Sequence, residues 1–363
     1  MNQTSDQSKE DAVEASASGD KKARISKGGC LLRAATILIL LGVIAYFVQA
    51  WFAPVVDPEI TKPVVINNNS GQSSGDSAAA NLPEGAITAG VNQQMIDDAE
   101  HPFEPLLKIA KLSLKEIDAN YRDYTTTLVS KVRADGELQE DKYIFCKIRH
   151  ASDWSEDEAN PPKIPFSVYS KFLAPKAITG QEAIWIKGQN DGKMIAHPNG
   201  WKNVVRVYLD PLDPLAMKGN RHPMYEIGFR NLLVKMVEIG AETKKHGETE
   251  VAIKRDVEIN ERLCTTFEVS HPVKRDHFEF HIARIYIDDE LNIPIAYEGF
   301  SWPEKPGGEP VLLERYIYTD IKLNVGLTDK DFDPGNEEYN YPCLLYTSPS
   351  PRDATLSRMP SSA

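Results

Sequence analysis

His277, Glu279 and His281 are the residues whose types and spacing most resemble a metal site. They alternate along a segment with the two-residue period of a β-strand, so their side chains would share one face. Zinc accepts two histidines and one carboxylate. Neighbours in such a row, however, lie roughly 7 Å apart along a straight line, so they do not surround an ion. The pattern favours a solvated polar face, and we predict no metal.

Two further patterns bear on catalysis. Residues 71–75 read Gly-Gln-Ser-Ser-Gly and match the G-x-S-x-G motif of serine hydrolases. That motif needs a strand before it and a helix after it, whereas here it lies in a low-complexity stretch, so we interpret it as a chance match. His222, in the loop segment Arg221-His222-Pro223, either organises its loop or takes part in function. We therefore predict no catalytic residue, no cofactor and no enzyme activity.

Apolar residues on predicted strands are the remaining candidate site. If they all point inward, they form either an ordinary core or the lining of an apolar ligand cavity in a sheet that does not close fully on its helices. The candidates are Phe166, Val168, Ile184, Ile186, Phe278 and Phe280.

Hydrophobic periodicity predicts the elements that would position these residues. Apolar residues at helical spacing predict helices over about 105–121 and 225–239, with Gly240 as a C-cap of the second helix. Alternating patterns separated by turn residues predict strands, and their order with the helices favours one α+β domain. Its expected form is a strongly curved antiparallel sheet or unclosed β-barrel packed on a few helices. The predicted strands cover about 124–132, 140–150, 166–172, 183–188, 193–197, 250–259, 265–271, 277–288, 293–301 and 311–320.

Residues 34–53 contain no charge and have the length that crosses a bilayer core, about 20 residues. Basic residues precede this run and acidic residues follow it, so the positive-inside rule places the N-terminus in the cytoplasm. A cleaved signal peptide is the alternative, but 33 residues precede the apolar run, and whole signal peptides have roughly 15 to 30. We predict an uncleaved single-pass anchor in the inner membrane, with the main domain extracytoplasmic (periplasmic).

Composition predicts the other segments. Residues 1–33 are predicted to be a disordered cytoplasmic tail. Residues 54–100 are rich in Pro, Asn, Ser, Gly and Ala and are predicted to be a flexible tether, with a mean span of roughly 40 Å. The α+β domain would then cover 101–342. The net charge of −12, without a basic cluster in that domain, argues against nucleic-acid partners.

The chain has 4 cysteines, too few for a disulfide framework. Cys146 and Cys264 lie in predicted strands, where they either pair in an oxidising compartment or serve as small buried hydrophobic residues.

From about Leu106 to Pro342 the chain resembles a bacterial domain-of-unknown-function family, family fifteen seventy-one, common in planctomycetes. The motifs that carry the resemblance are PFSVYSKFLAP at 165–175, AIWIKGQNDGKM at 183–194, RHPMYEIG at 221–228, ARIYIDDELNIPIAYEGFSWP at 283–303 and YIYTDIKLNVGLTDKDF at 316–332.

The last part is also similar to the ends of LolA-like and LolB-like lipoprotein carriers. This resemblance implies an unclosed β-barrel wrapped round helices, with an apolar cavity that holds acyl chains. The chain departs from the carriers in its predicted anchor and in lacking a signal peptidase site, which argues against a shuttling role. The matching positions are Ile287-Asp288, Pro294, Asn324, Leu327, Asp329 and Phe332. Residues 343–363 resemble translated adapter or vector sequence, so we interpret them as an artefactual tail.

These observations predict a membrane-tethered extracytoplasmic binding domain that holds a lipid, an acyl chain or a lipoprotein segment. The alternatives are a cell-envelope interaction or scaffold protein without a ligand cavity, and a periplasmic hydrolase. The expected partners are the inner membrane, through residues 34–53, and a lipid or lipoprotein; the oligomeric state is left open.

Overall fold

The computed structural model describes residues 61–68, 82–152, 163–199 and 205–342. The chain separates into two units, and all the described residues belong to the second, Phe52–Ala363. The predicted cytoplasmic tail, membrane anchor and artefactual tail lie outside the described residues. Within the described ranges, no helix is both long and apolar enough to cross a membrane.

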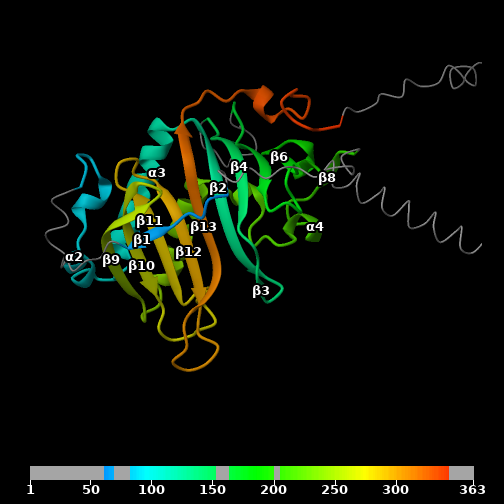
Figure 1. Cartoon of the computed structure of the whole chain (residues 1–363). Coiled ribbons are helices and arrows are strands. Elements are labelled where there is room, and N and C mark those ends of the chain that lie inside the picture. The colour runs from blue at the N-terminus through cyan, green and yellow to red at the C-terminus, as the bar shows by residue number, and fades with distance from the viewer. Residues whose placement is uncertain (1–60, 69–81, 153–162, 200–204, 343–363) are drawn as a thin grey trace, which may run out of the picture. The chain divides into compact units, whose positions relative to one another are not determined.

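In the described part of the chain, the strands form one 13-stranded antiparallel sheet (Figure 1). Its order is β1-β9-β10-β11-β12-β13-β2-β4-β5-β6-β7-β8, and β3 pairs with β2 off this path. The end strands β1 and β8 do not pair with each other, so the predicted unclosed antiparallel sheet is confirmed. The strands are β1 (Ile66–Asn68), β2 (Asp123–Ala134), β3 (Glu137–Leu138), β4 (Lys142–Arg149), β5 (Ser167–Ala174), β6 (Glu182–Ile186), β7 (Met194–His197), β8 (Val207–Leu209), β9 (Glu250–Ile259), β10 (Arg262–Ser270), β11 (Ile282–Asp288), β12 (Pro294–Ser301) and β13 (Val311–Leu323).

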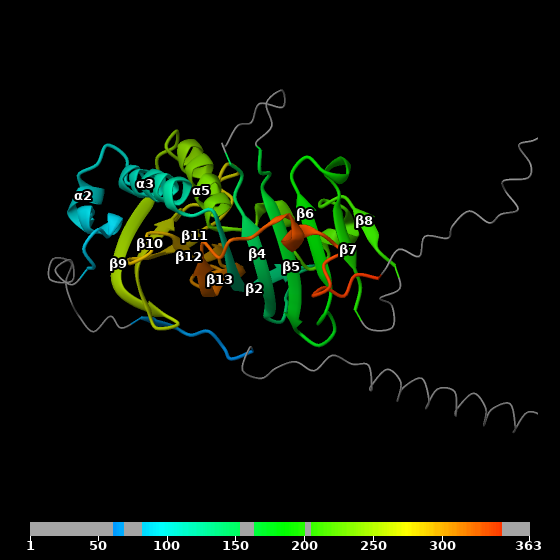
Figure 2. The ribbon, with the colours of Figure 1, turned by 90° about the horizontal axis from the view of Figure 1, so that it is seen from above.

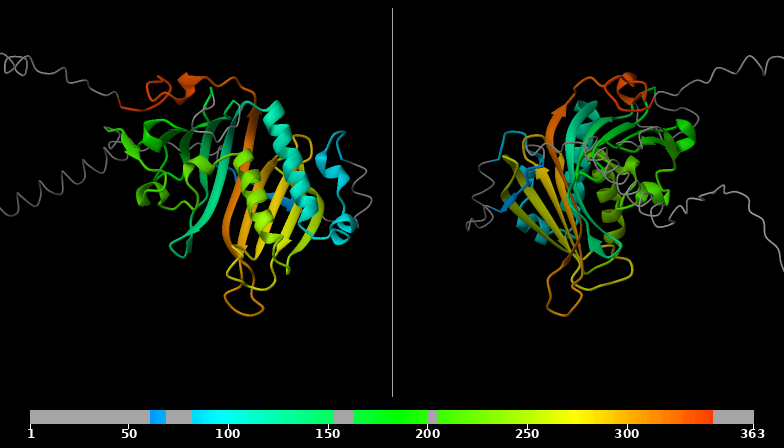
Figure 3. Two further views of the ribbon diagram at one scale, coloured as in Figure 1. Left: turned by 180° about the vertical axis from the view of Figure 1, so that it is seen from behind. Right: turned by 45° about the vertical axis from the view of Figure 1, so that its right-hand side comes forward.

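Two longer helices, α3 (Glu104–Asn120) and α5 (Phe229–Thr243), lie side by side over one face of the sheet, in front of β9 to β13 (Figures 2 and 3). Each turns an apolar stripe towards the sheet, as the helical spacing predicted. The shorter helical segments are η2 (Ile87–Gly90), α2 (Gln93–Asp97), η3 (Asn190–Gly192), α4 (Pro214–Met217), η5 (Met224–Glu226) and η6 (Asp329–Phe332).

The N-terminus of α5 is fixed by tyrosines that rise from the sheet. The hydroxyl of Tyr318 accepts a hydrogen bond from the backbone N–H of Gly228 (3.1 Å), and that of Tyr124 accepts one from Phe229 (3.1 Å). These bonds occupy backbone donors that a helix leaves without intrahelical partners. Gly228, at φ 121°, turns the chain into the helix, which explains why α5 begins later than predicted. The loop before α5 is therefore held at a defined place over the sheet.

Three predictions about segments are wrong. The expected tether over 54–100 includes structured parts: β1 pairs with β9, and Thr88 donates a hydrogen bond to Asp289 (2.7 Å). The expected strand 277–288 begins only at Ile282, so His277, Glu279 and His281 form no strand row. Gly240 lies inside α5 and not at its end. There the absence of a side chain lets α5 approach Leu107 of α3 and Phe103, the residue before α3.

The sheet carries apolar residues on both faces. The larger cluster lies on the helix-covered face and includes residues of the sheet and of α3 and α5. A second, smaller cluster lies on the opposite face, where the segment 324–341, here called the C-terminal strap, covers the strands. Its members are Tyr169, Ile184, Ile186, Ile195, Phe332, Tyr339 and Tyr341.

Candidate functional site

A cavity of about 1250 Å³ lies on the helix-covered side of the sheet. Strands β2 to β8 and β10 to β13 contribute to its wall, together with α5, the segment 205–227 and some residues of other loops. Most of the lining is apolar. The apolar side chains include Leu128, Val132, Ile144, Phe172, Ala183, Met194, Leu209, Met224, Ile227, Met236, Val269, Phe280 and Ile285.

The register of the strands orders this wall into cross-strand rows. One row is apolar and contains Ile144, Leu128 and Tyr318 on β4, β2 and β13. The next row, two residues nearer the β2–β4 turn, is polar and contains Lys142, Ser130 and Tyr316 on the same strands. Because residues two apart on a strand lie about 7 Å apart, the wall changes from apolar to polar over one step of the pleat.

Glu314 on β13 is the centre of a polar cluster at the cavity. Its Oε2 accepts hydrogen bonds from Arg221 Nε (3.0 Å) and Tyr316 OH (3.3 Å), and His222 Nε2 lies 3.0 Å away. The other ring nitrogen of His222, Nδ1, lies 2.9 Å from a carboxylate oxygen of Glu226. Ionised carboxylates only accept hydrogen bonds, so the imidazolium form of His222, which donates from both nitrogens, fits this site. The cluster joins the loop before α5 to the sheet.

The cluster shifts the pKa values of its members in opposite directions. The hydrogen bond to Glu314 raises the pKa of His222, although burial opposes this. Burial would raise the pKa of Glu314, but the hydrogen bonds and charges of His222 and Arg221 outweigh it and lower the pKa of that carboxyl. The negative charge of Glu314 is thus compensated within the cluster. Of the roles that the sequence left open for His222, organising its loop is the one that these contacts show.

Lys142, at the start of β4, ties the same loop to the sheet at a second point. Its Nζ donates hydrogen bonds to the carbonyl oxygen of Gly219 and to Oδ1 of Asn220 (2.8 Å). Gly219 has a φ of 67°, and a Cβ there would lie 3.3 Å from Nζ, so the loop is shaped closely around the ammonium group. Burial lowers the pKa of Lys142.

The sequence of residues 121–341 matches the family model described as "Protein of unknown function (DUF1571)". This chain belongs to the DUF1571 family. The match confirms the resemblance to family fifteen seventy-one and covers most of the cavity wall, including β2, β4 and β13. No curated protein matches the DUF1571 chain significantly.

Several crystal structures share features with this DUF1571 chain at low similarity. A DUF1329 family protein from Desulfovibrio piger is 11% identical, with 64% of this chain and 97% of that chain covered and a TM-score of 0.33. A putative outer membrane lipoprotein-sorting protein domain from Vibrio parahaemolyticus is 11% identical, with 62% and 95% covered and a TM-score of 0.31. A LolA superfamily protein from Nitrosomonas europaea is 11% identical, with 62% and 97% covered and a TM-score of 0.26. At such TM-scores, no residue role is transferred from these proteins.

The structure does not bring the predicted lining residues together on one face. Val168 is opposite Trp185, whereas Ile184 is opposite Tyr169, so Val168 and Ile184 point to opposite sides of the sheet. Ile184 and Ile186 pack beneath the C-terminal strap, and Phe166 and Val168 pack in the larger core. Among the predicted residues, Phe280 alone lines the cavity.

Phe278 also lies elsewhere than predicted. Its ring stacks on His271, with centroids 3.8 Å apart, in the irregular segment before β11. His277 stacks in turn on His246, with centroids 3.8 Å apart, which is a packing role and not ligation. Across the described residues, no three or more His, Cys, Asp or Glu side chains come together in a way that could hold a metal.

Sequence reasoning missed the polar end of the cavity. Lys142 lies two residues from Ile144 on β4, so both side chains point to the same face of the sheet. A charged residue on an otherwise apolar face could have indicated a polar end of the cavity. Arg221, His222 and Glu314 could not be grouped in the same way, because 93 residues separate Arg221 from Glu314 in the chain.

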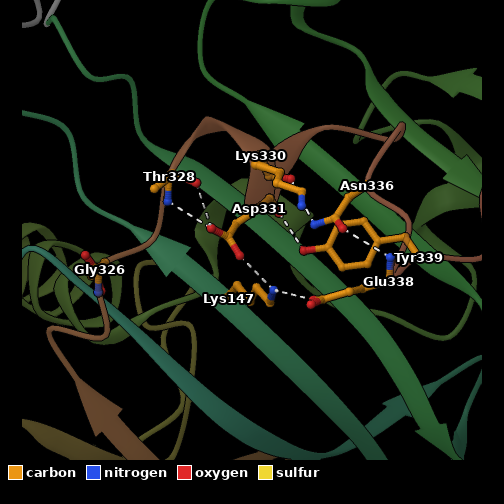
Figure 4. Close-up of polar contacts among 9 residues, drawn as sticks. Lys147, Gly326, Thr328, Lys330, Asp331, Asn336, Glu338 and Tyr339 are labelled. Atoms are coloured by element: carbon orange, nitrogen blue, oxygen red, sulfur yellow. Dashed lines mark hydrogen bonds and ion pairs between the residues drawn. The ribbon is translucent and has the colours of Figure 1, made fainter.

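On the opposite face, the C-terminal strap is held by charges as well as aromatic rings (Figure 4). Lys147 Nζ lies 2.8 Å from Asp331 Oδ1, and the Tyr339 hydroxyl donates a hydrogen bond to the Asp331 carbonyl (2.7 Å). Arg149 pairs with Asp329 (2.8 Å) and lies over the ring of Phe332. These contacts keep the outer face of β4 and β5 covered.

Proposed function

We propose that this chain is a membrane-tethered extracytoplasmic domain that holds an acyl chain or lipid in the cavity between sheet and helices. The observation that carries the proposal is the cavity itself: its volume of about 1250 Å³ exceeds the range usual for small-molecule sites, about 300–1,000 Å³. Its lining is mostly apolar, and each methylene group moved there from water contributes about 0.8 kcal/mol.

Two features argue for a lipid over a compact solute. Apolar lining residues are spread over β2, β4, β5, β6, β7 and β8, so the wall is long as well as wide. Met194, Met224 and Met236 lie in the lining, and methionine side chains adapt to flexible partners because they are unbranched and polarisable. A long flexible chain fits such a surface better than a rigid molecule.

The membrane tether supports a local role. Residues 34–53 have the length and apolar character of a membrane anchor. Because parts of the predicted tether, 61–68 and 82–100, are packed in the fold, the domain's reach is shorter than the roughly 40 Å expected of a free coil. A tethered lipid-binding domain would receive, present or sense lipids at the inner membrane and would not carry them away.

The ligand is tested by filling the cavity. Ala216, on α4, lines it, so Ala216→Trp should reduce binding of a neutral fluorescent acyl probe at least tenfold by occupying ligand space. Ala241→Trp is the matched control, because Ala241 is exposed on α5 and outside the cavity lining. Equal binding by both variants, or no binding by the wild-type chain, would contradict the proposal.

The tether is tested separately. The full chain should sediment with membranes and resist carbonate extraction, and deletion of residues 34–53 should release it. Recovery of the intact full chain in the soluble fraction would rule out the anchor.

A further inference from the structure

Lys142 is a cation inside an otherwise mostly apolar wall. It lies on β4 in register with Ser130 of β2, and Ser130 is in turn in register with Tyr316 of β13. All these residues line the cavity. The side chain is half-buried, and its ammonium group faces the loop at Gly219 and Asn220.

The ammonium group of Lys142 has no carboxylate partner among the residues described. Its hydrogen-bond acceptors are neutral, the Gly219 carbonyl and the Asn220 amide oxygen, and an ammonium group has three protons to donate. Lysines on the outer face differ: Lys131 pairs with Asp141 (3.2 Å) and Lys147 with Asp331 (2.8 Å). A partly buried charge without a counter-ion is costly, so an anion at this position would be stabilised.

Lys142 is the partly buried lysine of the cavity lining, whereas Lys218 and Lys235, which also line the cavity, are exposed. Glu314 is already bound by Arg221 and His222, which compensate its charge. Glu137, on β3, and Glu140, just before β4, also line the cavity but are exposed, and solvent screens exposed charges. An anion that reached Lys142 would therefore meet a cation in a partly desolvated place, where the carboxylate of Glu314 is already paired and those of Glu137 and Glu140 are screened by solvent.

The polar row ends where the apolar wall begins. Ile144 and Leu128 follow Lys142 and Ser130 by one step of the pleat, about 7 Å, and Phe172 extends the apolar surface onto β5. A molecule with an anionic head at Lys142 would thus place its apolar chain directly against Ile144, Leu128 and Phe172.

We infer that Lys142 binds the anionic head, a carboxylate or a phosphate, of a single-chain amphiphile whose chain occupies the apolar part of the cavity. The inference rests on the proposed function, because it assigns the head group of the same ligand. Lys142 also holds the loop at Gly219, so bound anion and loop position are linked through one side chain.

The test compares heads on one chain length. Dodecanoate, dodecyl phosphate and dodecanol displace Nile red, a neutral probe, from the full chain held in amphipol. The wild-type chain should bind both anions roughly tenfold to hundredfold more tightly than the alcohol, the effect of a charge-assisted hydrogen bond. Lys142→Met should lose this preference and keep its affinity for dodecanol within roughly twofold. Whichever anion binds more tightly identifies the head, carboxylate or phosphate.

Lys131→Met is the matched control, because Lys131 lies on the outer face of β2 beside Asp141 and outside the cavity lining. It should keep the full preference for anions. Lys142→Arg, which retains the charge, should restore most of the preference. Lys142→Gln is the second variant without the charge, and it is used if Lys142→Met does not fold. A preference for anions that survives in a folded variant without the charge, or a wild-type chain that binds all three molecules equally, overturns the inference alone. Failure of all three to displace the probe overturns the proposed function as well.

Discussion

The rings of Tyr169 and Tyr339 stack across the outer face of the sheet, with centroids 4.1 Å apart and planes 9° from parallel. Tyr169 belongs to β5 and Tyr339 to the C-terminal strap. The pair joins the last described segment of the chain to the strands whose other face lines the cavity. Stability of the wall and closure of the outer face therefore depend on the same contact.

Tyr339→Ala should destabilise the fold by about 2 kcal/mol, because it removes a buried ring, a stacked aromatic pair and the hydrogen bond to Asp331. The free energy of unfolding from urea titration measures this loss. Glu337→Ala, at an exposed neighbouring position, should change it by less than about 0.5 kcal/mol. Acyl-probe affinity should be unchanged in folded Tyr339→Ala, since the strap lies on the face opposite the cavity. A similar small effect from both variants would show that the strap is not fixed to β5.

The contact between α3 and α5 predicts an unusual effect at Gly240. In an exposed helix interior, Gly→Ala stabilises by about 1 kcal/mol. A Cβ at Gly240, however, would lie 2.7 Å from Leu107 Cδ2 and closer still to the ring of Phe103. We expect Gly240→Ala to destabilise by about 1–3 kcal/mol through overpacking, measured by urea unfolding.

The neighbouring residue provides the control for Gly240. Ala241 is exposed on the same helix, so Ala241→Gly should cost only the propensity difference of about 1 kcal/mol. If Gly240→Ala were stabilising instead, the two helices would have to lie farther apart than they do in the structure.

The cluster of His222 and Glu314 predicts that the loop before α5 is held most firmly in a limited pH window. The pKa of His222 is raised from 6.5, so its contribution is complete below that value and is lost as the pH rises through the raised pKa. The pKa of Glu314 is lowered from 4.5, so its contribution is complete above that value and is lost as the pH falls through the lowered pKa. Both contributions are present together between about pH 4.5 and 6.5.

Hydrogen exchange of the 218–227 amides, corrected for intrinsic rates, measures this window. Protection should fall on both sides of it, and His222→Gln should remove the dependence on the alkaline side. The amides of α3, which lie outside the cluster, serve as the internal control. A pH-independent loop, or a wild-type profile unchanged in His222→Gln, would show that the contact between His222 and Glu314 does not hold the loop.

The periodicity of apolar residues was sufficient to predict the long helices and most strands, because each of these elements packs one face against the core. β9 has the predicted bounds, and α3 begins and ends within one residue of its prediction. The side chains of β6 that face the cavity could not be predicted. Ile184 and Ile186 are apolar because the C-terminal strap buries them on the outer face, and not because they line the cavity. When both faces of a strand are covered, apolar alternation no longer tells one from the other.

The cavity depended on information that no local pattern contains. Its polar end arises where β4, β2 and β13 become neighbours, although β13 is far from the other two in sequence. Gly240 shows the same limit at one residue. Its place near the end of a helical pattern suggested a cap, whereas the close approach of Phe103, just before α3, is what excludes a side chain.

The two described cysteines settle a question that the sequence left open, and they lead to a final prediction. Cys146 on β4 and Cys264 on β10 are both buried and free, and β11, β12, β13 and β2 lie between their strands. This separation prevents a disulfide, which needs Cα atoms within about 7 Å. Burial raises the pKa of Cys146 to about 12 and also raises that of Cys264, so few thiolates form. Because the thiolate is the reactive species, neither residue should react with a maleimide in the folded chain.

The measurement uses a chain with Cys30→Ser and Cys343→Ser, so that only Cys146 and Cys264 can be labelled. Mass spectrometry should find both unlabelled and reduced after prolonged exposure to the maleimide at mildly alkaline pH, and both labelled in concentrated urea. A linked Cys146–Cys264 peptide in the folded chain would contradict the strand order of the sheet. Rapid labelling of Cys146 alone would mean that the cavity side of β4 opens to solvent, since Cys146 has the same inward parity as Ile144 and Lys142.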